Sequence, residues 1–373
     1  KMTTFNEDLD KLREQYDNLP YPQIPLERSP QENETLDELF IHSLVTSTYL
    51  RTQEVTDTTG KVILDAGCGS GYKALVLAEA NPGAKIVGVD LSEASIQYAR
   101  KRLSYHGLQA NTEFHTMPLE DIAQLGIQFD YINCDEVIYL LPNPALGIQA
   151  LKSVLKSDGI LRINFHSQFQ RQDYYRGQLL FKMMGLTDET PDTLEADTVI
   201  AVMQSLKNEV RLKSLAWSEN VKGADLNGQR EIAMMNFLIQ GDRGFMVPEV
   251  FDLLEQSQLD FISMVGWRHW ELQDLFQTPD DLPMVLALGL PGLSAQEQFH
   301  LFELLHPVHR LIDLWCGHPN SSQISEPTDM TLSDWQTATI HLHPLLLRAS
   351  VKEKFTQTIH THQPCNLRDF IVL

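Results

Sequence analysis

The sequence is poor in cysteine, and its cysteines do not form the pairs that a metal site or a disulfide framework needs. A zinc ribbon requires C-x-x-C pairs, and a disulfide framework requires an even set at regular spacings. Neither is predicted, no metal is expected, and reduced thiols are typical of a cytoplasmic protein. The four cysteines are Cys68, Cys134, Cys316 and Cys365.

Positive charge and long apolar runs are scarce as well. The chain has 50 acidic residues against 29 lysines and arginines, a formal net charge of -21. Such a surface repels phosphate backbones, so no nucleic-acid partner is expected. No apolar run approaches the roughly 20 residues that span a bilayer, so no membrane partner is expected. The first residues are acidic and amphipathic, unlike a secretory signal.

Hydrophobic residues make up 43% of the 373 residues, enough for a buried core in one large domain or two smaller ones. From residue 61 to 165, short apolar runs alternate with helical patterns, which predicts an α/β fold with a parallel sheet. The expected strands are 61–65, 85–90, 111–115, 129–134 and 159–165, and the expected helices are 72–80, 93–106, 120–125 and 144–156.

Residues 61–71 read KVILDAGCGSG, an apolar run followed by an acid and three glycines. Strand, glycine loop and helix in succession predict a nucleotide-sized site at the carboxyl edge of a sheet, where Gly67 and Gly69 leave room for a ligand. The dinucleotide fingerprint needs its third glycine one place later, at Tyr72, so a pyrophosphate fits poorly. Asp65 beside the loop favours a cationic ligand instead.

A second acid, Asp90, ends the next expected strand nineteen residues after Gly71. An acid at this spacing is placed to accept hydrogen bonds from ribose hydroxyls. An adenosine that carries a sulfonium and an ammonium group fits both the ribose acceptor and the acid beside the loop.

Four segments together resemble the Rossmann-like (class I) methyltransferases that use S-adenosylmethionine. They are VILDAGCGSG at 62–71, VGVDLS at 87–92, FDYINCDEVIYLLPNP at 129–144 and LKSDGILRINF at 155–165. The resemblance covers roughly residues 60–185 and implies a Rossmann-like, doubly wound, mostly parallel sheet with S-adenosyl-L-methionine as cofactor. Residues 302–307 and 314–316 resemble a feature of cyanobacterial-type methyltransferases with a large C-terminal extension.

The resemblance also implies roles for single residues. Asp90 would hold the ribose diol, Leu91 would pack on adenine, and Cys134 would lie against the methionine part or be a small buried hydrophobe. Many relatives place an acid after the third strand, where this chain has Pro118, so backbone atoms of Met117 or Leu119 are expected at the adenine, with Glu120 nearby. The residues expected around methionine and ribose are Asp65, Gly67, Cys68, Gly69 and Gly71.

The catalytic prediction rests on a departure from the family. Small-molecule relatives often carry a histidine pair after strand four, which is absent from residues 137–144. Transfer from a sulfonium mainly needs in-line positioning, and a base is needed only if the acceptor must lose a proton. We therefore expect Glu136 to orient a cationic amine or accept a proton, Tyr139 to lie near the methyl group, and His166 to act as base or as a structural hydrogen bonder.

Five residues are expected to contact the acceptor: Tyr16, Tyr21, Asp135, Arg171 and Tyr175. The two N-terminal tyrosines lie in an extension that in the family covers the cofactor pocket. Asp135 would orient the acceptor, or instead cap a helix or be solvated, and the latter is favoured. Arg171 and Tyr175 would stack a planar or cationic acceptor, or form a packing face.

The expected organisation is an N-terminal helical cap (1–58), a Rossmann-like core (59–176), and a helical lid and substrate region (177–373) whose late strands complete the sheet. Outside the core, the pattern predicts helices at 5–17, 35–50, 168–184, 193–216, 248–258 and 297–315, a loop at 218–230, and strands at 259–265 and 369–373.

The predicted function is methyl transfer from S-adenosylmethionine to nitrogen or oxygen of a small organic acceptor, a metabolite or natural product, in the cytoplasm. The alternatives are a peptide or protein methyltransferase, which would have an open groove, and a non-catalytic scaffold that binds the cofactor. A nicotinamide-dependent oxidoreductase is disfavoured by the glycine spacing. The expected partners are the small acceptor and, as an alternative to a monomer, a second copy of the chain in a homodimer.

Overall fold

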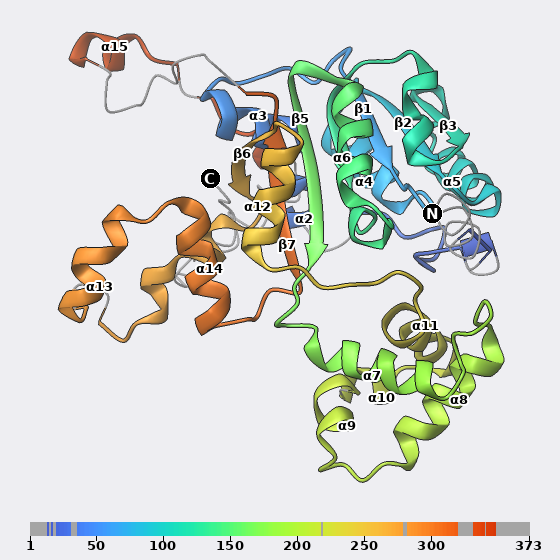
Figure 1. The fold of residues 1–373 in the computed structure, drawn as a ribbon. Helices are drawn as coiled ribbons and strands as arrows, with labels where there is room; N and C mark the ends of the chain where they lie inside the picture. The colour runs from blue at the N-terminus through green and yellow to red at the C-terminus, as the bar shows by residue number, and fades with distance from the viewer. Residues whose placement is uncertain are drawn as a thin grey trace, which may run out of the picture.

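The structure is a computed structural model that describes residues 13–14, 16–17, 20–30, 36–217, 219–278, 282–319, 331–339 and 341–347. In these residues the chain forms one seven-stranded sheet in the order β3–β2–β1–β4–β5–β7–β6 (Figure 1). The strands are β1 (Val62–Ala66), β2 (Lys85–Asp90), β3 (Thr112–Thr116), β4 (Phe129–Cys134), β5 (Leu155–His166), β6 (Asp260–Met264) and β7 (Leu311–Gly317).

Strands β1 to β5 are parallel, which confirms the doubly wound α/β core. β1 and β4 are hydrogen-bonded neighbours although β2 and β3 lie between them in the sequence. The chain therefore reverses its winding at this point, and a crevice opens beyond the carboxyl ends of β1 and β4.

Helices cover both faces of the sheet, so alternate side chains of a strand enter different cores. Ile63 packs in the cluster that contains residues of α4 (Tyr72–Ala80) and α5 (Glu93–Tyr105). Leu64 packs in the cluster with α6 (Pro144–Ser153) and α12 (Val247–Gln256). Burial on both faces is the reason why β1 begins with the continuous apolar run Val62-Ile63-Leu64.

The C-terminal part of the chain adds two antiparallel strands. β7 pairs antiparallel with β5, and β6 pairs antiparallel with β7, so the strand expected at 259–265 is confirmed. The helix expected at 297–315 is wrong in its second half, because α14 (Ala295–Leu305) ends before Pro307 and β7 follows. A proline cannot continue a helix, and the strand buries the residues beyond it. The strand expected at 369–373 lies outside the described residues.

Five helices between β5 and α12 form a cluster with its own apolar core, below the arrowhead of β5 in Figure 1. The loop expected at 218–230 is wrong, because Asp225 caps a helix there by accepting from the Gly228 amide at 2.8 Å. The helix expected at 193–216 is divided in two. The cluster contains α7 (Gln172–Met183), α8 (Thr193–Ser205), α9 (Arg211–Ala216), α10 (Glu219–Gly223) and α11 (Leu226–Phe237).

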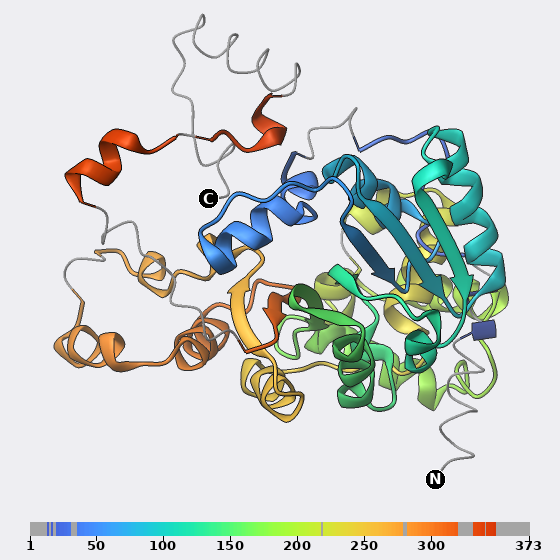
Figure 2. The same ribbon diagram turned by 90° about the horizontal axis from the view of Figure 1, so that it is seen from above.

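The N-terminal part lies along the core. The helix expected at 35–50 is observed as α2 (Leu36–Ile41) and α3 (Leu44–Thr52), and Figure 2 shows α3 beside β6. Residues 20–30, which we call the N-terminal strap, are held by the buried Arg102, which donates to the carbonyls of Ile24 and Pro25 at 2.7 and 2.9 Å. Most of the helix expected at 5–17 lies outside the described residues.

The other helices are shorter. The helix expected at 120–125 is a 3-10 helix over Leu119–Leu125, and two more short helices are α13 (Met284–Gly289) and α15 (Leu332–Thr337). No helix in the described ranges is long and apolar enough to cross a membrane.

Candidate active site

A cavity of about 530 Å³ lies at the crevice beyond β1 and β4. Its walls come from the glycine loop, the end of β2, the segment after β4, the N-terminal strap, the helical cluster and Arg310 before β7. The volume lies in the range of roughly 300–1,000 Å³ that is typical of small-molecule sites.

Most residues that the sequence pointed to meet at this cavity. Of the residues expected to hold the cofactor, Gly67, Cys68, Gly69, Asp90, Leu91, Met117 and Leu119 line it. Of those expected to act on the acceptor, Glu136, Tyr139, His166, Tyr16, Tyr21, Asp135 and Arg171 line it. The remaining four, which the described part of the chain places outside the lining, are Asp65, Gly71, Cys134 and Tyr175.

The glycine loop is shaped by the protein's own backbone. Gly67 and Gly69 have φ angles of +78° and +49°, which side chains rarely adopt. A Cβ on Gly67 would lie 2.2 Å from Val137 Cγ2, and one on Gly69 would lie 2.2 Å from the Tyr21 carbonyl oxygen. The expectation that both missing side chains leave room for a ligand is therefore corrected, because Val137 and the N-terminal strap fill these two directions.

Asp90 stands at the edge of the loop with both carboxylate oxygens fixed. One oxygen accepts from the Gly69 amide and the other from the Ser92 amide, each at 2.9 Å. Burial raises the pKa of Asp90 above its usual value, against these hydrogen bonds. The remaining lone pairs of a carboxylate oriented in this way can accept from a diol.

Asp65 lies behind the loop. Its Oδ1 accepts from Asn133 Nδ2 at 2.8 Å, and its buried Oδ2 has no hydrogen-bond partner. Burial raises the pKa of Asp65 to about 7. The negative charge that the sequence places beside the site is therefore only partly present at neutral pH.

His166, at the end of β5, presents one ring nitrogen to the cavity. Nδ1 lies 2.7 Å from Asp242 Oδ1, and the ring stacks on Tyr139 with centroids 3.9 Å apart. Because the carboxylate of Asp242 can only accept a hydrogen bond, Nδ1 of His166 carries the proton and Nε2 carries the lone pair. Nε2 accepts from Arg310 Nη1 at 3.2 Å. Burial lowers the pKa of His166 below 6.5, despite the hydrogen bond to Asp242, so the ring is neutral at pH 7.

Asp242, in the loop after α11, is, like Arg310, a residue that sequence reasoning missed. Its side chain is fully buried, and its second oxygen accepts from Gln178 Nε2 at 2.8 Å and from Arg171 Nη2 at 3.4 Å. It follows Gly241 in a polar stretch 76 residues from His166, and no pattern in the sequence connects the two. Three donors hold its carboxylate, so its pKa is below the usual value although burial opposes this.

Glu136 forms a two-pronged ion pair with Arg310, at 2.6 and 2.8 Å. Tyr139 Oη donates to the same carboxylate at 3.3 Å. Burial would raise the pKa of Glu136, but the hydrogen bonds and charge of Arg310 hold it below the usual value. Glu136 is therefore an ionised, paired carboxylate, which makes it a weaker base than the sequence suggests. Burial keeps Tyr139 protonated by raising its pKa.

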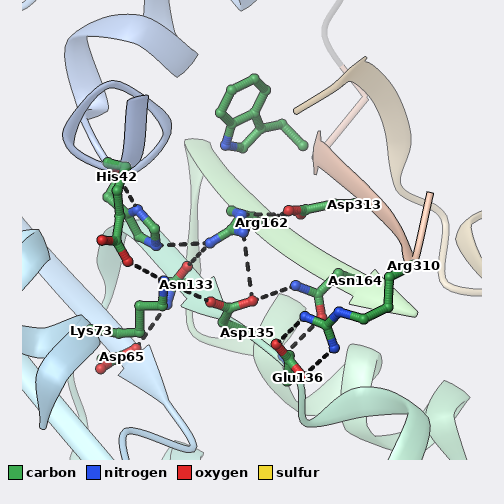
Figure 3. Close-up of polar contacts among 12 residues, drawn as sticks. His42, Asp65, Lys73, Asn133, Asp135, Glu136, Arg162, Asn164, Arg310 and Asp313 are labelled. Carbon is green, nitrogen blue, oxygen red and sulfur yellow. Dashed lines mark hydrogen bonds and ion pairs between the residues drawn. The ribbon is translucent and has the colours of Figure 1, made fainter. Parts of the chain in front are cut away.

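Asp135 belongs to a buried charge network rather than to a helix cap or a solvated surface (Figure 3). It accepts from Asn164 Nδ2 at 2.5 Å and lies 3.5 Å from Arg162 and 3.6 Å from Lys73. Arg162 in turn pairs with Asp313 of β7 at 2.6 and 3.0 Å. Burial opposes ionisation, but Arg162 and Lys73 hold the pKa of Asp135 far below 3.8.

Arg171 and Tyr175 differ in their position relative to the cavity. Arg171 lines the cavity, donates to Asn236 Oδ1 at 3.2 Å and stacks on Tyr174, with Cζ 4.8 Å from the ring centroid. Tyr175 packs against Gly244, where an added Cβ would lie 2.8 Å from its ring. Of this pair, only Arg171 is placed to meet a ligand. Within the residues described, no group of three histidine, cysteine or acidic side chains is arranged to hold a metal ion.

Comparison with known proteins identifies a domain within the chain. Residues 57–227 match the family model described as a methyltransferase domain. These residues are a methyltransferase domain. This domain is of the Rossmann-like methyltransferase type, and S-adenosylmethionine is confirmed as the cofactor expected of it.

The match to relatives covers only part of their own length. An uncharacterized protein of Synechococcus sp. is 26% identical over 246 residues, which are 66% of this chain and 57% of that protein. A ubiquinone biosynthesis O-methyltransferase of Actinobacillus pleuropneumoniae is 33% identical over 114 residues, 29% of this chain and 47% of that one. The chain thus spans about half the length of these relatives. Among solved structures, PKMT2 from Rickettsia typhi in complex with AdoHcy matches with a TM-score of 0.59 at 16% identity. The match covers 82% of this chain and 57% of that chain, and it shows that the two share a fold.

The residues that line the cavity fit both the ribose and the adenine of the cofactor expected of the methyltransferase domain. Asp90 offers acceptors to the ribose, and Leu91 and Leu119 offer apolar walls to a purine. Glu120 also lines the cavity, and its buried Oε1 has no hydrogen-bond partner. An unpaired buried acceptor is costly, and the adenine amino group would satisfy it. Glu120, two residues after Pro118, would thus take the role of the acid that many relatives place there.

Proposed function

We propose that this protein transfers the methyl group of S-adenosylmethionine to a hydroxyl oxygen of a small organic acceptor, with His166 as general base. The single observation that carries the proposal is the neutral ring of His166 at the cavity wall, held at Nδ1 by the buried Asp242. A base with a pKa near or below neutrality serves an acceptor that must lose a proton, as a hydroxyl must.

The residues divide the work between proton transfer and orientation. The bound cofactor supplies an activated methyl group on a positively charged sulfur. His166 Nε2 would take the proton that the acceptor hydroxyl loses when it accepts the methyl group. Asp242 keeps the ring in the required tautomer and stabilises the imidazolium that results. The stacked Tyr139 holds the plane of the ring.

Arg310 sets the condition for this step. It donates to His166 Nε2, so an incoming hydroxyl has to take its place at the lone pair. The two-pronged contact with Glu136 keeps the guanidinium at the cavity when it leaves the histidine. The lone pair of His166 Nε2 therefore becomes available only when the acceptor displaces Arg310. Without an acceptor, the contact with Arg310 limits protonation of His166 by water.

A small acceptor suits the walls better than a protein chain. The N-terminal strap crosses the glycine loop, where the Ser70 amide donates to the Tyr21 carbonyl at 2.9 Å. Met235 of the helical cluster and Ile239, just after it, line the cavity. Apolar walls with a few polar groups favour a metabolite. The similarity to a ubiquinone biosynthesis O-methyltransferase supports oxygen as the methylated atom.

The test is a search for the labelled product. The protein is incubated with methyl-labelled S-adenosylmethionine and with the small-molecule and protein fractions of a cell extract, separately. We expect label to enter a small product as a methyl ether, and His166→Ala to lower its formation at least about 100-fold. Label in protein alone, or a His166→Ala variant of full activity, would overturn the proposal.

A further inference from the structure

Lys73 and Glu38 form an ion pair that the proposed proton transfer does not use. Lys73 lies in the first turn of α4 and Glu38 in α2, with Nζ and Oε1 2.5 Å apart. Both residues line the cavity beside Gly69, and their side chains are 32% and 19% exposed. In the view of Figure 3, Lys73 lies on the opposite side of Asp135 from Glu136 and Arg310.

The charges around this pair do not balance. Lys73 also lies 3.6 Å from Asp135, which is shared with Arg162, and Arg162 is shared with Asp313. The connected group contains three carboxylates, including Glu38, and two cations. His42 Nε2 accepts from Arg162 Nη1 at 2.9 Å, and burial lowers the pKa of His42 well below 6.5, so His42 adds no charge at neutral pH. One negative charge is left over at the cavity wall, where a cationic group would neutralise it.

We propose that Lys73 and Glu38 bind the amino-acid end of the cofactor, Lys73 its α-carboxylate and Glu38, with Asp135, its α-ammonium. This inference rests on the proposed function, because it takes the methionine part to lie beside the glycine loop. A zwitterion brings one group for each member of the pair, so the carboxylate meets the cation and the ammonium lies beside the two carboxylates that share it, while the net charge of the group stays the same. Charge-assisted contacts of this kind are stronger than neutral hydrogen bonds when they are partly buried.

The pair therefore selects which adenosyl compounds bind. S-adenosylhomocysteine keeps both charged groups and is bound as well as the methyl donor at this end. 5′-Methylthioadenosine has the same nucleoside and sulfur but no amino-acid end. A deaminated analogue of S-adenosylhomocysteine keeps the carboxylate only. The three compounds separate the contribution of Lys73 from that of Glu38 without any acceptor or turnover.

The experiment is isothermal titration of the full chain at pH 7.5 with these three ligands. We expect wild type to bind S-adenosylhomocysteine at least about tenfold more tightly than 5′-methylthioadenosine. Lys73→Met should weaken S-adenosylhomocysteine and its deaminated analogue at least about fivefold and leave 5′-methylthioadenosine within twofold. Glu38→Gln should weaken S-adenosylhomocysteine alone.

Lys85 and Glu113 provide the matched control. They form an ion pair of 2.6 Å between β2 and β3, outside the cavity lining, with side chains 47% and 39% exposed. Lys85→Met and Glu113→Gln should change the affinity for none of the three ligands. Thermal melting of each variant checks folding, and Lys73→Arg, which keeps the cation, should retain most of the preference even where Lys73→Met is unstable.

The outcomes separate this inference from the proposed function. Equal weakening of S-adenosylhomocysteine and 5′-methylthioadenosine by Lys73→Met, or no weakening of either, overturns the assignment of the pair. Binding that follows the expected pattern in a protein that methylates no hydroxyl overturns the proposed function and leaves this inference standing. Wild-type protein that binds none of the three ligands overturns both.

Discussion

Replacing Asp242 by asparagine tests whether its carboxylate tunes His166. The substitution keeps the shape of the side chain and removes its negative charge. Because the charge favours the imidazolium, its loss should lower the pKa of His166 further, not raise it. The ring should then stay neutral at pH 7.

The size of the effect follows from the contact. Nδ1 and Oδ1 are 2.7 Å apart and Asp242 is fully buried. Unit charges about 4 Å apart at an effective dielectric constant near 20 interact by about 4 kcal/mol, which is roughly 3 pKa units as an upper bound. The amide dipole of asparagine keeps part of this interaction energy. We therefore expect the pKa of His166 to fall by about 1 to 3 units.

The assay is nuclear magnetic resonance of labelled histidine rings over pH 5 to 8, with Asp252→Asn, an exposed change on α12, as control. Once an acceptor is known, Asp242→Asn should lower kcat about 100-fold or more and leave the affinity for S-adenosylhomocysteine within twofold. The melting temperature should also fall, because Arg171 loses its ionic partner. A His166 pKa and tautomer identical to wild type would refute the reasoning.

Three further predictions concern the loop and the adenine. Glu120→Met should weaken S-adenosylhomocysteine about tenfold in calorimetry and remove any preference over the inosine analogue, since the amino group loses its acceptor. Asp65→Asn should raise the stability in urea unfolding by up to about 4 kcal/mol at pH 8 and change little at pH 4, because a folded-state pKa of about 7 destabilises the fold progressively as pH rises from about 4 to 7. Gly71→Ala should cost about 1–3 kcal/mol in the same assay, since φ is +81° and the new Cβ would lie 2.6 Å from Ala99 Cα.

The parallel core could be predicted because its signals are local. Apolar runs of strand length, the glycines of the loop and the cap Ser92, which accepts from the Ser95 amide at 3.0 Å, each act within a few residues. Asp90 was found for the same reason, since its distance from the loop is set by one helix and one strand. The helices at 219–223 and 226–237 were missed because polar residues and Gly228 hide a short amphipathic pattern that the cluster core stabilises.

The amino-acid sequence by itself determined the half of the cavity around the glycine loop and Asp90, because strand, loop and acid are neighbours along the chain. The tertiary structure alone decided the half around His166 and Glu136, to which we assign the reaction. Asp242 reaches His166 across 76 residues and Arg310 reaches Glu136 across 174, through the insertion of a helical cluster and the antiparallel pairing of β7 with β5. Such pairs have no periodic signature, since their proximity depends on packing between distant segments. The chemistry of the cavity was therefore set when those segments met.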